Sequence, residues 1–163
     1  IEENFFSLMN AVNAMAETYD MPILYSCHPR SQKMIEKRGF KFDPRVIKHE
    51  PLGFFDYNHL QQNAFCVVSD SGTVPEEGAY FKFPAVSVRT STERPEAMDK
   101  GVFVIGSITS EAVCQAVNMA VEMHKSGDDA CDVPAYVDEN VSTKVVKLIQ
   151  SYTGIINKMV WRK

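Results

Sequence analysis

A short polar segment in the middle of the chain has the composition of an anion-binding turn. Ser71, Gly72 and Thr73 follow the apolar run 65–69, and a helical pattern begins directly after them. Small side chains let a ligand approach the backbone closely, and the first N–H groups of a helix have no partner inside the helix. The helix dipole adds positive potential at the same point. The segment therefore predicts a site for a diphosphate group.

Two charged side chains are candidates to complete this site. Glu77 lies on the helix after the turn, and we assign it to the hydroxyls of a ribose because a carboxylate accepts two hydrogen bonds from a diol. Arg94 lies at a loop–helix boundary, where its guanidinium can close over a phosphate. The alternative for Arg94 is a weak surface ion pair with Glu93 or Glu96. The alternative for the turn is an ordinary strand–helix connection.

Other polar and aromatic residues near these positions have two interpretations. Glu76 points about 100° away from its neighbour Glu77 on a helix, so we interpret it as an acidic residue that favours the helix dipole. His28 follows an apolar strand, and its residue type alone leaves a structural and a functional role open. Three aromatic residues belong either to the core or to a surface for a base: Phe54, Phe55 and Tyr57.

Length and composition indicate one ordinary globular domain that spans residues 1–163. Of the 163 residues 45% are hydrophobic and 23% are charged, and the net charge of −4 argues against a nucleic-acid surface. The four cysteines are widely spaced and form no CxxC pair, so neither a disulfide framework nor a zinc site is expected. No apolar run reaches the ~20 residues of a membrane span, and the first residues do not resemble a signal peptide. These features favour a cytoplasmic protein without a membrane or nucleic-acid partner.

Helical and strand-like patterns alternate along the chain. Asp56 is a candidate cap for the third helix, Gly39 ends the second, and Gly154 is expected to separate the closing helix from an apolar tail at 154–163. Helices are predicted at about 3–19, 31–38, 56–63, 73–81, 95–100, 110–125 and 140–152, with a loop at 130–138. Strands are predicted at 23–27, 45–49, 65–69, 85–89 and 102–105.

This alternation predicts an α/β fold with a Rossmann-like parallel sheet and helices on both faces. Ligands of such sheets bind beyond the carboxyl ends of the strands. Polar clusters follow the first four strands at 28–30, 54–57, 71–72 and 92–94, so four loops are expected to meet at one edge. No strand precedes the first helix, and we therefore expect the chain to be part of a longer protein.

Several motifs together resemble the non-hydrolysing UDP-N-acetylglucosamine 2-epimerase family. They are Ser69-Asp70-Ser71-Gly72 with Glu76-Glu77, then Phe83-Pro84-Ala85-Val86, then Thr92-Glu93-Arg94-Pro95-Glu96, with His28-Pro29-Arg30 and Pro51-Leu52-Gly53-Phe54 upstream. The resemblance implies the C-terminal half of a GT-B-type two-domain enzyme, without its N-terminal domain. Thr73 and Pro75 depart from the family, which usually has glycine and glutamine there. The segments 53–58 and 71–73 look most like the branch that acts on UDP-2-acetamido-2,6-dideoxy-L-talose and makes UDP-N-acetyl-L-fucosamine.

The resemblance implies an isomerase that inverts C2 of a UDP-N-acetylhexosamine by elimination and re-addition of UDP, for surface polysaccharides such as capsules. The conversion is either UDP-GlcNAc to UDP-ManNAc or that of the L-talose to L-fucosamine branch. It implies no cofactor and no metal, acid and base groups mainly in the missing domain, a homodimer for the full-length protein, and an inactive isolated chain. The alternatives are the donor-binding domain of a GT-B glycosyltransferase and a non-catalytic nucleotide-binding module. The implied UDP-sugar residues are Ser71, Gly72, Thr73, Arg94, Glu77 and Phe54, with His28 in the cleft as a catalytic candidate.

Overall fold

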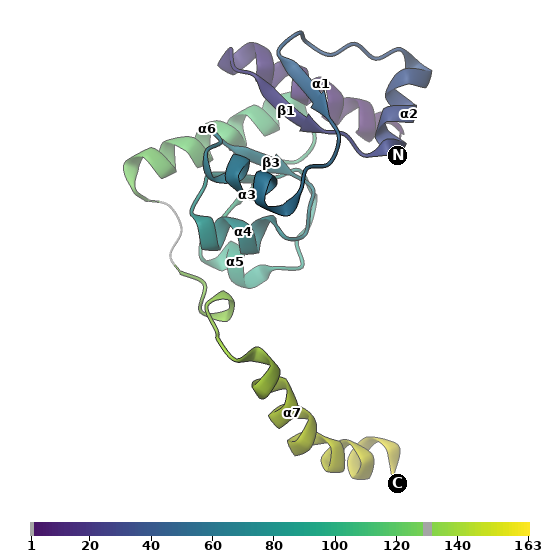
Figure 1. Cartoon of the computed structure of the whole chain (residues 1–163), viewed down its shortest axis with the longest axis vertical. Helices are drawn as coiled ribbons and strands as arrows, with labels where there is room; N and C mark the ends of the chain where they lie inside the picture. The colour runs from purple at the N-terminus through teal and green to yellow at the C-terminus, as the bar shows by residue number, and fades with distance from the viewer. Residues whose placement is uncertain (1, 129–131) are drawn as a thin grey trace. The chain divides into compact units, whose positions relative to one another are not determined.

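A computed structural model describes residues 2–128 and 132–163 of the chain (Figure 1). By its internal contacts the chain divides into two compact units, Ile1–Asp132 and Val133–Lys163. The strands and the helices between them all belong to the first unit.

The first unit alternates helices and strands as the sequence predicts. Its helices are α1 (Glu2–Tyr19), α2 (Pro29–Arg38), α3 (Phe54–Gln62), α4 (Val74–Phe81), α5 (Pro95–Asp99) and α6 (Ser110–Ser126). Its strands are β1 (Ile23–Ser26), β2 (Val46–His49), β3 (Val67–Ser69), β4 (Ala85–Ser87) and β5 (Val104–Ile105).

All of these strands pair in parallel, but in two ladders rather than in one continuous sheet. One ladder joins β1 to β2, and the other has the order β3-β4-β5. Within the described chain no ladder bonds join β1 to β3. The strands are only two to four residues long, and a common apolar core, rather than backbone pairing, holds the ladders together. Both ladders contribute side chains to that core, namely Ile23, Val46, Val68, Val86 and Val104.

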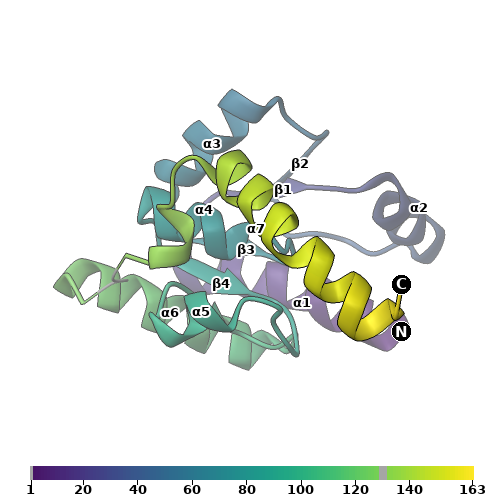
Figure 2. The same cartoon turned by 90° about the horizontal axis from the view of Figure 1, so that it is seen from below.

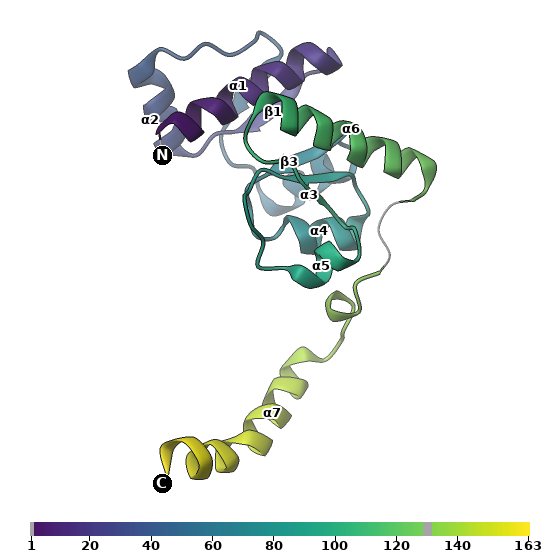
Figure 3. The same ribbon diagram turned by 180° about the vertical axis from the view of Figure 1, so that it is seen from behind.

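Helices cover both faces of the β3-β4-β5 ladder. Helices α1 and α6 pack on each other and run side by side on one side of the strands, whereas α4 and α5 lie on the other side (Figure 3). Figure 2 shows the same layers from below, with α4 and α5 nearer the viewer than α1. The core between α1, α6 and the strands is built from Ala11, Val12, Met15, Val113, Ala116 and Val117.

The helix boundaries expected at Asp56 and Gly154 differ from the sequence prediction. Asp56 does not cap α3, because Gly53 takes the cap position in an extended conformation and its carbonyl accepts the N–H of Tyr57. Asp56 lies in the first turn, where its negative charge still favours the helix dipole. Gly154 does not end α7 (Val141–Ile156), since the hydrogen bonds of the helix continue through it. A glycine inside a helix costs only about 1 kcal/mol, which the regular turns on both sides outweigh.

The second unit contains little beside α7. A 3-10 turn, η1 (Pro134–Tyr136), precedes the helix, and a π-helical turn, η2 (Asn157–Trp161), follows it. The predicted loop 130–138 lies partly outside the described residues. No helix in the described parts of the chain is both long enough and apolar enough to cross a membrane.

The cysteines of the described chain are free thiols: Cys27, Cys66 and Cys114. Cys131 lies outside the described residues. Cys27 is buried, and burial raises the pKa of the Cys66 thiol to about 12. Cys66 and Cys114 are partly buried and pack against the apolar core.

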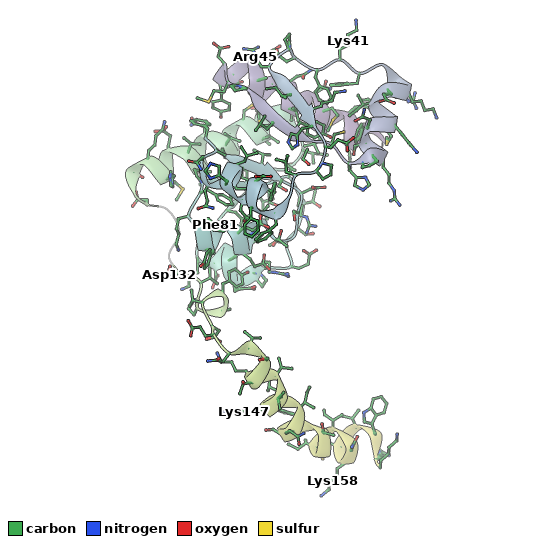
Figure 4. All side chains as sticks on the ribbon, in the orientation of Figure 1. Lys41, Arg45, Phe81, Asp132, Lys147 and Lys158 are labelled. Atoms are coloured by element: carbon green, nitrogen blue, oxygen red, sulfur yellow. The ribbon has the colours of Figure 1, made fainter. Side chains whose placement is uncertain are left out.

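An ion pair fixes the turn before β2 and gives the unit a defined acid response. Arg45, labelled in Figure 4, donates to both carboxylate oxygens of Asp43 at 2.8 Å. These hydrogen bonds, and one from the Arg45 backbone, lower the pKa of Asp43 from 3.8 to about 2. Because the folded pKa is depressed, the stabilisation is complete above pH 3.8 and is lost as the pH falls through 2.

An NMR titration should give an Asp43 midpoint near 2, and in Arg45→Met the midpoint should return toward 3.8.

Candidate functional site

The loops after β3 and β4 are neighbours because the two strands end in register. Ser69 pairs with Ser87 at the carboxyl ends of the strands. The N–H of Val88 then donates to the Ser69 carbonyl at 3.1 Å, which continues the contact beyond the ladder. The polar turn at 71–73 and the loop 90–94 therefore start from adjacent points of one sheet edge, as the sequence predicts.

The turn after β3 leads directly into the N-terminus of α4. The Ser71 N–H donates to the Ser69 hydroxyl at 3.1 Å, and the Thr73 N–H donates to the Ser71 hydroxyl at 3.3 Å. A side chain built at Gly72 would meet no atom within 4 Å, so the space over this residue is open. The turn thus leaves open space over Gly72 at the N-terminal end of α4, where the helix dipole favours an anionic group.

Hydroxyls and a carboxylate form a continuous hydrogen-bond chain along this turn. The Ser71 and Thr73 hydroxyls lie 3.0 Å apart, and Thr73 donates to Glu77 Oε1 at 2.8 Å. Gln61 of α3 donates its Nε2–H to the other oxygen, Glu77 Oε2, at 2.6 Å. Sequence reasoning did not single out Gln61, since nothing in the pattern of α3 shows that this residue faces α4.

The aromatic residues of α3 divide into an exposed pair and one residue near Glu77. Phe54 is 75% exposed and Phe55 is 84% exposed, so neither belongs to the core. Tyr57 is half-buried, and burial raises its pKa, as does the charge of Glu77, while a hydrogen bond with Gln61 opposes the rise. The Tyr57 phenol is therefore protonated at neutral pH. The Phe54 ring packs against the Phe55 ring, with the ring centroids 5.6 Å apart.

Arg94 is held by a carboxylate that the sequence analysis had assigned to the helix dipole alone. Its Nε donates to Glu76 Oε1, and the pair joins α4 to the start of α5. The Arg94 backbone N–H also donates to the Thr92 hydroxyl at 3.1 Å. Glu76 and Glu77 thus point in different directions, as the helix geometry predicts, and each carboxylate holds a different part of the candidate site.

Arg89 joins the two loops and was not identified from the sequence. Its Nε donates to the Asp70 carbonyl at 2.7 Å, and its Nη1 donates to Glu93 Oε2 at 2.8 Å. One guanidinium therefore connects the turn after β3 with the loop that carries Arg94. The available signal was a single charged residue at the end of an otherwise apolar strand, where side chains meet the ligand edge of the sheet.

His28 caps α2 and thereby acquires a defined tautomer. Its Nδ1 accepts the Arg30 N–H at 3.2 Å, so the proton of the neutral ring lies on Nε2. The ring therefore offers an N–H donor on its other side. No hydrogen bond joins His28 to Ser71, Glu77 or Arg94 in the described part of the chain.

The arrangement suits an organic anion that also carries hydroxyl groups. The open turn at Ser71 and the nearby Arg94 are complementary to phosphate, and the Glu77 carboxylate is an acceptor for hydroxyls. Among the residues that the structure describes, no three His, Cys, Asp or Glu side chains gather as possible metal ligands.

Comparison with known proteins assigns this fold and turn to a family. Residues 1–150 match the sequence profile of the family described as UDP-N-acetylglucosamine 2-epimerase. The chain belongs to the UDP-N-acetylglucosamine 2-epimerase family. A curated family member from Methanocaldococcus jannaschii, named UDP-N-acetylglucosamine 2-epimerase, is 27% identical over 129 residues, which are 77% of this chain. The match covers 35% of that relative, so this chain corresponds to about a third of the relative's length.

Solved UDP-N-acetylglucosamine 2-epimerases have the same fold. The enzyme from Rickettsia bellii superposes with a TM-score of 0.82 and 34% identity, over 99% of this chain and 44% of that one. The Methanocaldococcus jannaschii enzyme, solved with UDP-GlcNAc and UDP, gives a TM-score of 0.79 at 23% identity, over 93% of this chain and 41% of that one. These neighbours, which are of the GT-B type, confirm the predicted α/β fold with parallel strands.

Proposed function

We propose that this chain is the UDP-binding part of an enzyme that inverts C2 of a UDP-N-acetylhexosamine. The observation that supports this most is the hydrogen-bond chain from Ser71 through Thr73 to Glu77, which lies beside the loop of Arg94. It provides an anion site and a carboxylate acceptor at adjacent positions of one sheet edge. A UDP group needs both, because it carries a diphosphate and a ribose diol.

Each residue then has a defined role. Ser71 and the backbone of Gly72 and Thr73 bind the diphosphate, together with Arg94, and Glu77 accepts the ribose hydroxyls. His28 presents its Nε2–H to the cleft near UDP, in agreement with the tautomer that its cap bond requires. Phe54 is exposed and is available to the substrate.

The proposed reaction removes a proton from C2 and expels UDP from C1, which gives a 2-acetamidoglycal. A proton is then delivered to the other face of C2, and UDP adds back to C1. Negative charge on the diphosphate grows as UDP departs, so the donors that bind it also stabilise the transition state. The groups that move the C2 proton are expected outside this chain.

For the sugar, we propose the branch that acts on UDP-2-acetamido-2,6-dideoxy-L-talose. The residues at 53–58 and 71–73, which resemble that branch, support this choice. The full-length protein is proposed to act as a homodimer in the cytoplasm, where it supplies precursors of surface polysaccharides.

The test is solvent deuterium incorporation by the full-length protein. The protein is incubated in D2O with the L-talose substrate or with UDP-N-acetylglucosamine, without any acceptor, and C2 is followed by NMR. Deuterium at C2 and an inverted sugar are expected with the L-talose substrate, and turnover of UDP-N-acetylglucosamine alone would overturn the choice of sugar but not the epimerase function. The isolated 163-residue chain serves as the control and should show negligible turnover. An intact C2–H, with sugar transfer only after an acceptor is added, would instead identify a glycosyltransferase.

A further inference from the structure

Gln61 is an unusual residue for the interior of this domain. Its side chain is 3% exposed, and its Nε2 donates to Glu77 Oε2 at 2.6 Å. Its Oε1 is buried and has no hydrogen-bond partner among the described residues. A buried amide oxygen without a partner is costly, so the contact with Glu77 must outweigh that cost.

The amide can face Glu77 in only one orientation. If the amide were rotated by half a turn, Oε1 would face the carboxylate, and two partially or fully negative oxygens would repel each other. The donor edge of Gln61 is thus fixed toward the carboxylate.

Glu77 is held at both of its oxygens by neutral donors. Gln61 occupies Oε2, and Thr73 donates to Oε1 at 2.8 Å. Each carboxylate oxygen has two lone-pair directions, so one acceptor site on each oxygen is left for a ligand. Because amide and hydroxyl donors carry no net charge, the carboxylate is oriented without being neutralised.

We propose that Gln61 is a positioning residue that orients Glu77 toward the ribose diol, with Thr73 as the second half of this clamp. This inference rests on the proposed function, in which Glu77 accepts the ribose hydroxyls. A carboxylate fixed in advance loses no rotational freedom when the ligand binds, which increases its ability to distinguish ribose from deoxyribose.

The test compares UDP with 2′-deoxy-UDP by calorimetry on the full-length protein. The wild-type protein should bind UDP about tenfold more tightly than 2′-deoxy-UDP, the factor expected for one hydrogen bond. In Gln61→Met, which keeps a side chain of similar length, this ratio should fall close to one. Thr73→Val is a second variant at an exposed site and should reduce the ratio without affecting folding. Gln62→Met is the control, since this exposed residue donates to the Asn58 carbonyl of its own helix and makes no hydrogen bond to Glu77 in the part of the chain that the structure describes.

If these residues served folding alone, their substitution would weaken the binding of UDP and of 2′-deoxy-UDP equally and leave the affinity ratio unchanged. That result in Gln61→Met and Thr73→Val would overturn the positioning role. Glu77→Gln separates this failure from failure of the proposed function. If Glu77→Gln loses the ratio while the clamp variants keep it, the ribose assignment stands and the role of Gln61 is wrong. If wild-type protein binds no UDP, the proposed function fails, and the role of Gln61 fails with it.

Discussion

Replacing Arg94 with alanine is expected to raise the dissociation constant of UDP by about ten- to hundredfold, the scale of a charged hydrogen bond of ~1.5–3 kcal/mol. Arg94 is held through Nε by Glu76, so the guanidinium is oriented before the ligand arrives. Nη1 of the same guanidinium donates to the Glu93 carbonyl at 3.3 Å, so the planar fork, whose geometry matches phosphate oxygens, is held from two sides. The variant removes both the charge and this fork.

Calorimetric titration of the full-length protein with UDP measures this effect. Lys100→Ala is the matched control, because it removes a positive charge from the other end of α5. The affinity of Lys100→Ala for UDP should equal that of the wild-type protein, which would exclude a general effect of net charge on UDP binding. Arg94→Lys keeps the charge without the fork and should bind with intermediate affinity. Wild-type affinity in Arg94→Ala would remove this residue from the site.

Replacing Gly106 with alanine is expected to destabilise the first unit by about 1–3 kcal/mol, the usual cost of overpacking a core. A Cβ at this position would lie 2.7 Å from Val86 Cγ1 and 3.1 Å from Ala116 Cβ. Val86 is fully buried and Ala116 is 5% exposed, so neither neighbour has space to move. Gly106 also donates its N–H to the Ser87 carbonyl at 2.9 Å, and a shift there would disturb the edge of the sheet that carries the site.

Urea unfolding followed by circular dichroism measures this destabilisation. Gly154→Ala is the matched control, because its new methyl group meets no atom within 4 Å and lies inside a helix. That variant should be as stable as the wild-type protein or slightly more stable. Val86→Ala makes room for the new methyl group, so the double variant Gly106→Ala/Val86→Ala should cost less than the sum of the single changes. Strict additivity would argue against the collision.

Local sequence patterns predict most of the helices and strands of the fold. Features that depend on contacts between residues far apart in the sequence were not predicted. Short apolar runs in the sequence predict the alternation of helices and parallel strands. Gly39 ends α2 with a φ of 62°, as its position indicates. The choice of Gly53 over Asp56 as a helix cap depends on how the chain leaves β2, which residue preference does not encode. The division into two ladders depends on backbone contacts between strands far apart in the sequence.

The candidate site also combines contacts that are local in the sequence, which could be predicted, with contacts between distant residues, which could not. Ser71, Thr73 and Glu77 are separated by two and four residues along the chain, so their contacts follow from a strand–helix connection at 71–73. Gln61 reaches Glu77 across 16 residues, and Arg94 reaches Glu76 across 18. Both contacts depend on which faces of α3 and α5 meet α4, and the short, weakly amphipathic α3 carries no signal of its orientation.

The packing of α1 against α6 sets an order of events during synthesis of the chain. Ser7 of α1 donates to the Ile108 carbonyl 101 residues later, and Tyr19 donates to the Cys114 carbonyl 95 residues later. At a translation rate of about 5–20 residues per second, α6 is synthesised roughly 5–20 s after α1, and the apolar face of α1 has no helix to pack against during that time. During that interval Val12 and Met15 are available to chaperones on the ribosome. Until α6 emerges, the nascent chain lacks the partner that completes its main core.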